Sequence, residues 1–591
     1  MKRKNIYSVL VGCIVVCALS ACTDDWNEHY QADRPLEGQT ENSNDNLWEI
    51  ISSDQDLEEF SALLKATGYD TLLTKNRSYT VWAPVDGSGF IDVDVLKNAK
   101  AEELDAYKKE IVENHIAHFI HAASGIRDKE DRKNYETIEM LNTKKYDFEG
   151  VTAGEYTFEG LALKSANIAA KNGMLHKLNG YVGFAANLWE QLGREKSISM
   201  LWNFLKKDFK REFNPNASVQ GPMDGDQVTW LDSAFTESCR WFSEIGWLDR
   251  EDSSYTMYAM TDAAWEKMYQ RTSAYFDFSN WDGKNTQASK GNLTPEQARD
   301  SIVYNLMCRN LVFSNTINKK FYEGKTDSLI SNAYSRQIFV GEEARALSDG
   351  TIAGYPMTLS NGTLYVVDEV NYNPFTCWFD TLRVQGESLS DASETRKGFE
   401  KSFKSVNYIH RDSLLYDCVS GNAVGIYKAE GSGYNVNPVF RFYVNDLLSA
   451  YYRVKIVLLP PHILNPLDTT FVKPNKFRAR LFDSKVLNIM AVDKTDGDSV
   501  FISNPTKIDT IVLYDCFKMP YSDYQKKALI NVDPTIHLEI TSDISFGRVR
   551  GFDNVGTKKK PVTETDSLAW NFDNDYRIDQ VIFEPIIPEG E

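Results

Sequence analysis

The sequence is poor in the residues that most often carry chemistry or covalent cross-links. Its 591 residues include only 8 His and 8 Cys, and the cysteines in the body of the chain lie far apart. This scatter excludes a zinc pattern or a disulfide framework, which both need clustered residues. The sequence also lacks G-x-S-x-G, H-E-x-x-H, the G-x-x-x-x-G-K-[ST] phosphate loop and a G-x-G-x-x-G run after a strand. We therefore expect no cofactor, no metal site and no catalytic residue, and we predict that the chain is not an enzyme.

Positive charge is also in short supply. The chain has 65 Lys and Arg against 84 Asp and Glu, which gives a net charge of −19. Nucleic acids and anionic membrane surfaces would repel such a chain, so we expect no nucleic-acid partner. Hydrophobic residues make up 42% and charged residues 25%. These fractions are ordinary for globular proteins and exclude a mostly disordered chain.

A long apolar run occurs only at the start of the chain. Basic residues at positions 2–4 precede an apolar stretch from Ile6 to Ala21, which is shorter than the roughly 20 residues that a membrane span needs. A charged start, a short apolar core and small residues before a cut predict a secretory signal at 1–21. The run LSAC, which ends at Cys22, resembles the bacterial lipoprotein box. This resemblance implies multiple acyl chains, palmitate among them, on Cys22, enough for stable anchoring in the outer membrane. An ordinary signal peptide with a chance Cys is the alternative.

An acidic pair, Asp24 and Asp25, follows the cysteine directly. Paired acids in this place resemble the surface-export signal of certain Gram-negative lipoproteins. The resemblance implies that the chain faces the cell exterior, and a solvated acidic linker is the alternative. Removing the signal and lipidating Cys22 leaves an odd number of cysteines. We expect them to be small buried apolar residues, and a single disulfide between two of them is the alternative. They are Cys239, Cys308, Cys377, Cys418 and Cys516.

Three short segments recur in the same order along the chain. The pairs are 79–86 with 255–262, 111–114 with 302–305, and 172–179 with 361–368. They match at four of eight, three of four and three of eight positions, and the second and third segments are separated by 61 positions in one copy and 59 in the other. Such constant spacing predicts a tandem repeat of one domain type. We call these two stretches the first copy and the second copy.

The repeated segments resemble fasciclin (FAS1) domains. YTVWAPVDGSGF at 79–90 is similar to the first conserved block of that family, Asn114-His115-Ile116 to its NHI element, and NGMLHKLNG at 172–180 to its closing strand. The resemblance covers roughly residues 43–372. It implies compact α/β wedges built on a small β-sandwich, in a largely non-catalytic family associated with adhesion and binding. The second copy departs from the pattern at three positions, Met260, Leu306 and Tyr365.

The remaining part of the chain does not repeat this pattern. Residues 375–591 contain short runs rich in Val, Ile, Tyr and Phe, separated by Gly, Pro, Asn and Asp, which predict an antiparallel β-sandwich or jelly roll. The predicted fold class is therefore multidomain α+β. We expect a signal peptide at 1–21, a polar tether at 22–42, FAS1-like domains at 43–186 and 187–374, and a β-sandwich domain at 375–591.

Several residues have the chemistry of ligands but fit a structural role better. His115, His118 and His121 fall at the end of a predicted helix at 102–120 and directly after it, where steps of three spread them across one side instead of converging on a metal. Acidic runs at 493–498 and 573–575 contain oxygen ligands that calcium prefers, but neither has EF-hand spacing, and polar turns explain both. Aromatic rings such as Tyr451, Tyr452 and Trp378 could stack on sugars, although alternation within strands favours packing.

These observations favour a cell-surface binding protein. In bacteria with such lipoproteins, similar architectures accompany a TonB-dependent transporter closed by a lipoprotein lid. The resemblance therefore implies a non-catalytic accessory subunit of an outer-membrane nutrient-uptake complex that captures glycan or peptide. An adhesin that binds host matrix or neighbouring cells is one alternative. A surface hydrolase with its active site in the C-terminal sandwich is another, because 84 acidic residues make acid pairs available at any spacing.

Overall fold

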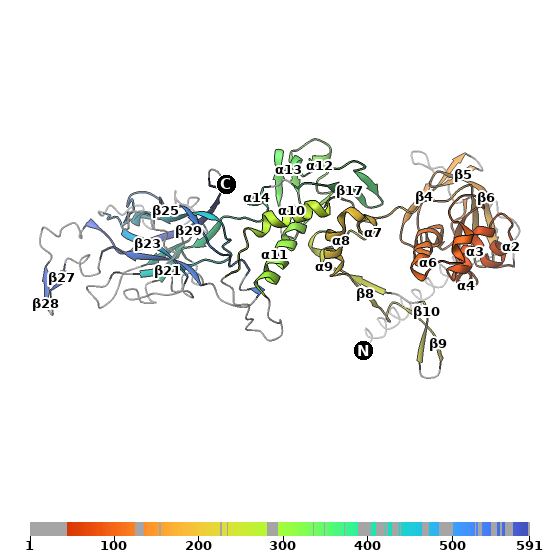
Figure 1. The fold of residues 1–591 in the computed structure, drawn as a ribbon, viewed down its shortest axis with the longest axis horizontal. Coiled ribbons are helices and arrows are strands. Elements are labelled where there is room, and N and C mark those ends of the chain that lie inside the picture. Colours follow the sequence, from red (N-terminus) through yellow and green to blue (C-terminus); the bar gives the residue numbers. More distant parts are fainter. Residues whose placement is uncertain are drawn as a thin grey trace, which may run out of the picture. The chain divides into compact units, whose positions relative to one another are not determined.

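The computed structural model describes residues 44–588 with gaps (Figure 1). The gaps are 124–134, 153–154, 225–226, 233–234, 280–293, 335, 348, 371–372, 388–403, 409–419, 421–422, 428–436, 438, 464–471, 484–499, 526–527, 530–534, 545–551, 556–557 and 562–570. The predicted signal peptide and tether, with Cys22, Asp24 and Asp25, lie outside the described residues. No helix in the described part of the chain is long and apolar enough to cross a membrane.

The chain divides into two compact units. The first comprises Met1–Asn187 with two short later segments, Asp249–Asp252 and Leu359–Asn361, and the second comprises the rest. The predicted division between 374 and 375 falls within the second unit and stays a prediction.

The first unit is built around a seven-stranded sheet with helices packed on it. Its helices are α2 (Leu47–Ser53), α3 (Glu58–Ala66), α4 (Tyr69–Leu73), α5 (Val93–Leu96) and α6 (Ala101–Tyr107). Its strands are β1 (Tyr79–Pro84), β2 (Ile116–His118), β3 (Tyr135–Glu139), β4 (Lys145–Thr152), β5 (Glu155–Phe158), β6 (Leu161–Ala170) and β7 (Gly173–Leu178). The strand order is β2-β1-β7-β6-β5-β4-β3, and β1 pairs with β7 in parallel.

Strand β1 separates two hydrophobic clusters. Because successive side chains point to opposite faces of a sheet, Val81 packs with the helices and Trp82 with the other face. The Trp82 ring stacks on Phe158 with centroids 4.6 Å apart, and on the His176 ring at 5.5 Å. Trp82 is a core residue, since its side chain is fully buried.

The helix predicted at 102–120 is only partly present. Helix α6 ends at Tyr107, a π-helical turn runs over Lys108–Val112, and a 3₁₀ turn over Glu113–His115 leads into strand β2. Sheet pairing competes with helix propensity here, because Ile116 lies opposite Val81 in the ladder. The prediction that one helix carries His115 and His118 is therefore wrong.

The first part of the second unit contains a smaller sheet with helices around it. Its helices are α7 (Leu188–Arg194), α8 (Ser199–Lys206), α9 (Arg240–Glu244), α10 (Asp262–Ser273), α11 (Pro295–Arg309), α12 (Lys319–Tyr322), α13 (Glu342–Ala346) and α14 (Pro374–Cys377). Its strands are β8 (Lys210–Phe213), β9 (Val219–Asp224), β10 (Gln227–Asp232), β11 (Phe235–Ser238), β12 (Tyr255–Met260), β13 (Val312–Ser314), β14 (Ser328–Ile330), β15 (Ile338–Val340), β16 (Met357–Leu359) and β17 (Gly362–Val367). One sheet has the order β13-β12-β17-β16, and the remaining strands pair antiparallel in three two-stranded sheets, β9 with β10, β8 with β11 and β14 with β15.

The repeated segments have the same strand register in both sheets. Tyr79 lies opposite Gly173 where β1 and β7 pair in parallel, and Tyr255 lies opposite Gly362 where β12 and β17 do. Both glycines are required at these positions, because a Cβ on Gly173 would lie 2.0 Å from the Tyr79 carbonyl oxygen and one on Gly362 1.9 Å from that of Tyr255.

The aspartate of each repeated segment caps a helix that precedes it in the chain. The Asp86 carboxylate accepts hydrogen bonds from the backbone N–H groups of Glu58 and Glu59, at 3.1 and 2.9 Å, at the start of α3. In the second copy, Asp262 accepts from the Met200 N–H at 2.7 Å, at the start of α8. A carboxylate at a helix N-terminus satisfies otherwise unpaired N–H groups.

The last part of the second unit consists mostly of antiparallel strands. They are β18 (Leu382–Gln385), β19 (Lys404–Tyr408), β20 (Ala423–Tyr427), β21 (Val439–Tyr443), β22 (Tyr451–Leu458), β23 (Lys476–Asp483), β24 (Phe501–Ile502), β25 (Asp509–Lys518), β26 (Ile536–Ser542), β27 (Phe552–Val555), β28 (Lys558–Pro561) and β29 (Tyr576–Ile586). One sheet has the order β19-β20-β29-β22-β25 with β18 paired to β29, a second has the order β21-β26-β23-β24, and β27 and β28 form a hairpin.

Two tyrosine hydroxyls connect the larger sheets. Tyr576 of β29 donates to the Lys476 carbonyl of β23 at 3.3 Å, and Tyr514 of β25 donates to the Ala479 carbonyl at 3.1 Å. Alternate side chains of β22, among them Tyr452, are buried. The strand-rich composition of this region is as predicted, whereas the arrangement as a sandwich or jelly roll stays a prediction.

Candidate binding cavity

The histidines that the sequence singled out have structural partners. His115 is fully buried, and its ring accepts a hydrogen bond from the Val182 N–H at Nε2, 3.0 Å away, while Nδ1 lies 2.7 Å from the Ile111 carbonyl oxygen. Burial lowers the pKa of His115 to about 4, so the ring is neutral at pH 7. The neighbouring Asn114 donates to the Val182 carbonyl at 3.0 Å. Asn114 and His115 therefore bind both the C=O and the N–H group of Val182. We call these two hydrogen bonds the NHI latch, and they give the NHI element a structural role.

The other candidate ligands are dispersed among the described residues. His118 is exposed at the end of β2. The Nδ1 atom of His121 lies 2.8 Å from the Oε1 atom of Glu136. No group of three or more His, Cys, Asp or Glu among the described residues could hold a metal ion. In the acidic run at 573–575, Asp573 pairs with Asn475 in an isolated β-bridge, and Asn574 is buried and donates to the Ile544 carbonyl at 3.0 Å. The acidic run at 493–498 lies outside the described residues.

The cysteines behave largely as predicted. Cys239, Cys308 and Cys377 are buried free thiols, whereas Cys516 is free but exposed. Burial raises the pKa of the Cys377 thiol to about 12, which keeps it protonated and unreactive at neutral pH. Cys418 lies outside the described residues.

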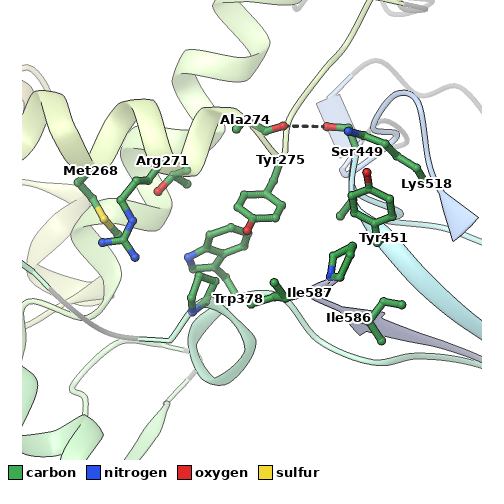
Figure 2. Close-up of a pocket in the computed structure, with 14 residues that line it drawn as sticks. Met268, Arg271, Ala274, Tyr275, Trp378, Ser449, Tyr451, Lys518, Ile586 and Ile587 are labelled. Carbon is green, nitrogen blue, oxygen red and sulfur yellow. Dashed lines mark hydrogen bonds between the residues drawn. The ribbon is translucent and has the colours of Figure 1, made fainter. Parts of the chain in front are cut away.

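A cavity of about 360 Å³ in the second unit combines aromatic, apolar and cationic side chains (Figure 2). It lies among helices α10 and α14 and the ends of strands β22, β25 and β29. Its volume is in the range of pockets that hold small ligands. The lining residues are Met268, Arg271, Thr272, Ala274, Tyr275, Pro374, Trp378, Ser449, Ala450, Tyr451, Lys518, Ile586, Ile587 and Pro588.

Helix α10 supplies one wall of the cavity. The helix begins with Thr261, whose side chain accepts from the Ala264 N–H at 3.2 Å, and its residues Met268 and Thr272 are buried one turn apart. Arg271 lies between them in sequence and is exposed toward the cavity side of the helix, as Figure 2 shows.

Aromatic rings give the cavity a rigid frame. Tyr275 follows α10 and meets the edge of Trp378 with ring centroids 5.4 Å apart, and Trp378 stacks on Phe379 at 6.0 Å. Ser449 closes this frame, because its N–H donates to the Tyr275 carbonyl at 2.9 Å and its hydroxyl accepts from the Asp277 N–H at 2.9 Å. Hydrogen bonds and ring contacts on several sides fix the positions of these groups before any ligand arrives.

The charged groups of the lining are both cations. Arg271 donates one long hydrogen bond of 3.5 Å to the Val370 carbonyl, and Lys518 places its Nζ 4.9 Å from the centroid of the Tyr451 ring. Within the described residues, neither Arg271 nor Lys518 has a carboxylate within ion-pair distance. Rings beside cations suit a ligand that has both an apolar face and a negative charge.

A second, larger cavity shares one residue with the first. It measures about 690 Å³ and is also lined by Trp378. Its charged lining residues are of both signs, two arginines and two acids, and Arg240 donates to the Asn305 side chain at 2.7 Å. This mixed lining has no excess of one charge, unlike the cavity of Figure 2.

Sequence reasoning found only part of this site. Trp378 and Tyr451 were noted as possible sugar-stacking rings, and both line the cavity. Arg271, Tyr275 and Lys518 were not singled out. The only sequence signal for Arg271 and Tyr275 is that a basic residue lies close to an aromatic one. Nothing in the sequence around Lys518 marks it as a site residue.

The comparisons with known proteins concern mainly the first unit. The model of the fasciclin domain matches residues 55–181. Residues 55–181 form a fasciclin domain. No curated protein matches the chain. The match covers the seven-stranded sheet and helices α3 to α6 of the first unit, and it includes the NHI latch and strand β1. FAS1 domains are associated with adhesion or binding at cell surfaces.

Two solved structures are also similar to the chain. One is a FAS1 domain pair from the insect cell adhesion molecule fasciclin I, at 11% identity and a TM-score of 0.18, covering 54% of this chain and 97% of that one. The other is a Paenibacillus xanthan lyase, at 10% identity and a TM-score of 0.18, covering 44% of this chain and 18% of that one. At these TM-scores neither likeness carries an argument about function.

Proposed function

We propose that the chain is a non-catalytic, lipid-anchored binding protein on the outer surface of a bacterial cell. In this proposal the acyl chains on Cys22 hold it in the outer membrane, and Asp24 and Asp25 direct it outward. Its role is that of an accessory subunit in a nutrient-uptake complex, where it captures glycan or peptide beside a TonB-dependent transporter and its lipoprotein lid. The observation that carries the proposal is the cavity of Figure 2, whose fixed rings and cations suit binding.

The proposal includes a tandem pair of FAS1 domains followed by a β-sandwich. The register shared by Gly173 and Gly362, and the helix caps made by Asp86 and Asp262, support the tandem pair. The hydroxyl bridge from Tyr576 to the opposite sheet supports the sandwich.

Affinity purification of the full chain from detergent-solubilised outer membrane tests this proposal. We expect a transporter and a second lipoprotein to co-purify. The matched control is Cys22→Ala, which removes the acylation site and should leave the chain out of the outer-membrane fraction. Recovery of the wild-type chain as a lone monomer would contradict the accessory role.

Surface orientation is tested separately on whole cells. External protease should degrade the wild-type chain, and Asp24→Asn with Asp25→Asn should protect it while membrane fractionation stays the same. Equal degradation of both would show that the acidic pair is only a linker.

An adhesin is the second candidate function. The fasciclin domain at 55–181 favours it, because such domains are associated with cell-surface adhesion. Under this alternative, intact cells bearing the chain would bind host matrix or neighbouring cells, no transporter would co-purify, and the Cys22→Ala variant would lose cell attachment.

A further inference from the structure

The cavity of Figure 2 departs from the charge balance of the whole chain. Acidic residues outnumber basic ones by 84 to 65 over the sequence, yet two basic residues and no acidic residue line the cavity in the part of the chain that the structure describes. We infer that this cavity binds an anionic saccharide, a sugar that carries a carboxylate or sulfate group, with Arg271 and Lys518 as its recognition residues. The inference rests on the proposed binding function and specifies the ligand class for it.

Cations near the cavity are paired, in contrast to the two that line it. Lys267, one turn before Arg271 on α10, lies 2.8 Å from Glu369. Lys455, on the same strand as Tyr451, lies 2.7 Å from Glu584. Within the part of the chain that the structure describes, Arg271 and Lys518 have no such carboxylate. Their positive charge is therefore available for an anion from outside.

The two cations enter the cavity from different parts of the unit. Figure 2 shows Arg271 beside Met268 on α10 and Lys518 beside Tyr451 at the strand ends. The Lys518 ammonium is held over the Tyr451 ring, and the Arg271 guanidinium touches the Val370 carbonyl with one of its donors. A guanidinium presents five N–H groups, so most of its donors can still meet a planar carboxylate or a sulfate.

The rest of the lining suits the ring of a sugar better than an extended peptide. Tyr275 and Tyr451, both only partly buried, provide ring surfaces, and the polar Ser449 is already engaged with the backbone on both sides. A pyranose has an apolar face that stacks on such rings. A peptide would instead need backbone donors and acceptors along its length, and Ser449 is committed to the frame.

Trp378 adds an observation that points to an acceptor-rich ligand. Its side chain is only 6% exposed, and its indole Nε1 has no hydrogen-bond partner in the described structure. A buried donor without an acceptor is unfavourable, and carboxylate or sulfate oxygens are acceptors. The donors exposed in the cavity are those of Arg271 and Lys518, and the Trp378 N–H is a buried donor in its wall.

Binding assays on the detergent-solubilised full chain test the ligand class. The probes are oligogalacturonate, sulfated chondroitin oligosaccharide, neutral xylo-oligosaccharide and a glutamate-rich peptide, each titrated at low and high NaCl. We expect one of the two acidic sugars to bind, with weaker binding at high salt because exposed charges are screened. The two acidic probes separate carboxylate from sulfate recognition.

Charge-neutral variants identify the site. We expect Arg271→Gln and Lys518→Gln each to weaken binding of the acidic sugar about tenfold, the loss that follows from one charge-assisted contact. The matched control is Lys267→Gln, which removes the same charge from the same helix but does not line the cavity. It should bind as the wild type does. Near-native circular dichroism of each variant excludes misfolding as the cause.

The outcomes separate this inference from the proposed function. Preference for the neutral sugar or the peptide, or undiminished acidic-sugar binding by the Arg271→Gln/Lys518→Gln double variant, would overturn the anionic saccharide and leave ligand capture intact. If no probe binds but a transporter co-purifies, the inference fails and the accessory role stands. If no probe binds and the chain is recovered alone, both fail.

Discussion

Mild acid should loosen the fasciclin domain through two buried histidines. His115 and His176 are both fully buried, and burial lowers the pKa of each to about 4. An unfolded histidine has a pKa near 6.5. Below that pH these histidines bind protons in the unfolded chain but stay neutral in the folded domain. The free energy of unfolding therefore falls as the pH drops from about 6.5 toward 4.

The size of the effect follows from these pKa values. At pH 5 an unfolded histidine is almost fully protonated, whereas a folded one with a pKa of about 4 is protonated only to about one tenth. Between pH 7 and pH 5, each histidine therefore removes about 2 kcal/mol from the free energy of unfolding, and the two together about 4 kcal/mol. Most carboxylates titrate below this window, so the histidines dominate it.

Hydrogen exchange measures this locally in the full chain. The free energy of opening, obtained from the amide protection factors of strands β1 and β7, should fall by nearly 4 kcal/mol between pH 7 and pH 5. The His115→Gln variant keeps an acceptor for the Val182 N–H but cannot titrate, so its pH-dependent loss should halve. The exposed His118→Gln is the control and should change nothing. An unchanged loss in His115→Gln, or no loss in the wild type, would refute the reasoning.

Three further predictions concern stability and reactivity. Gly173→Ala should destabilise the first unit by about 3 kcal/mol in denaturant titration, because its Cβ would lie 2.0 Å from a carbonyl oxygen, whereas Gly183→Ala, with open space around it, should change stability by less than about 0.5 kcal/mol. Lys144→Met should lower the first unit's stability by about 3–5 kcal/mol, because the buried Glu251 carboxylate, 2.5 Å from the Lys144 ammonium, loses its cationic partner and keeps only the Asn187 amide; unchanged melting would contradict this. A maleimide should label Cys516 in the folded chain, and mass spectrometry should show that adduct missing in Cys516→Ser.

The sequence allowed the first copy to be predicted well because its motifs have local structural tasks. The aspartate at the end of YTVWAPVD caps a helix, and Gly173 sits where no Cβ fits. Such constraints act on single positions and therefore appear in the sequence. The exception is the stretch around Ile116, where a helical pattern gives way to a strand because β1 offers a ladder partner far away in the chain.

The cavity could not be predicted in the same way. Arg271 and Lys518 are about 250 positions apart, and each looks like an ordinary surface cation in its own element. The property that distinguishes them is the lack of a carboxylate neighbour among the described residues, which depends on the packing of several elements. The aromatic residues gave a partial signal. Tryptophan is rare in the C-terminal region, which draws attention to Trp378, but the alternating pattern of its strand made Tyr451 look like a packing residue.

The two stretches named copies differ at the positions of two buried histidines. The first copy keeps His115 and His176, which are consumed by internal hydrogen bonds. The second copy has Leu306 and Tyr365 in their places, and Tyr365 stacks on Tyr258 with centroids 4.9 Å apart, as His176 stacks on Trp82 in the first copy. The helices of the second copy contribute to both cavities: α10 lines the smaller one, and α11, through Leu306, lines the larger. Because walls of both cavities come from the second copy and not from the first, substitutions that change ligand binding are expected in the second copy.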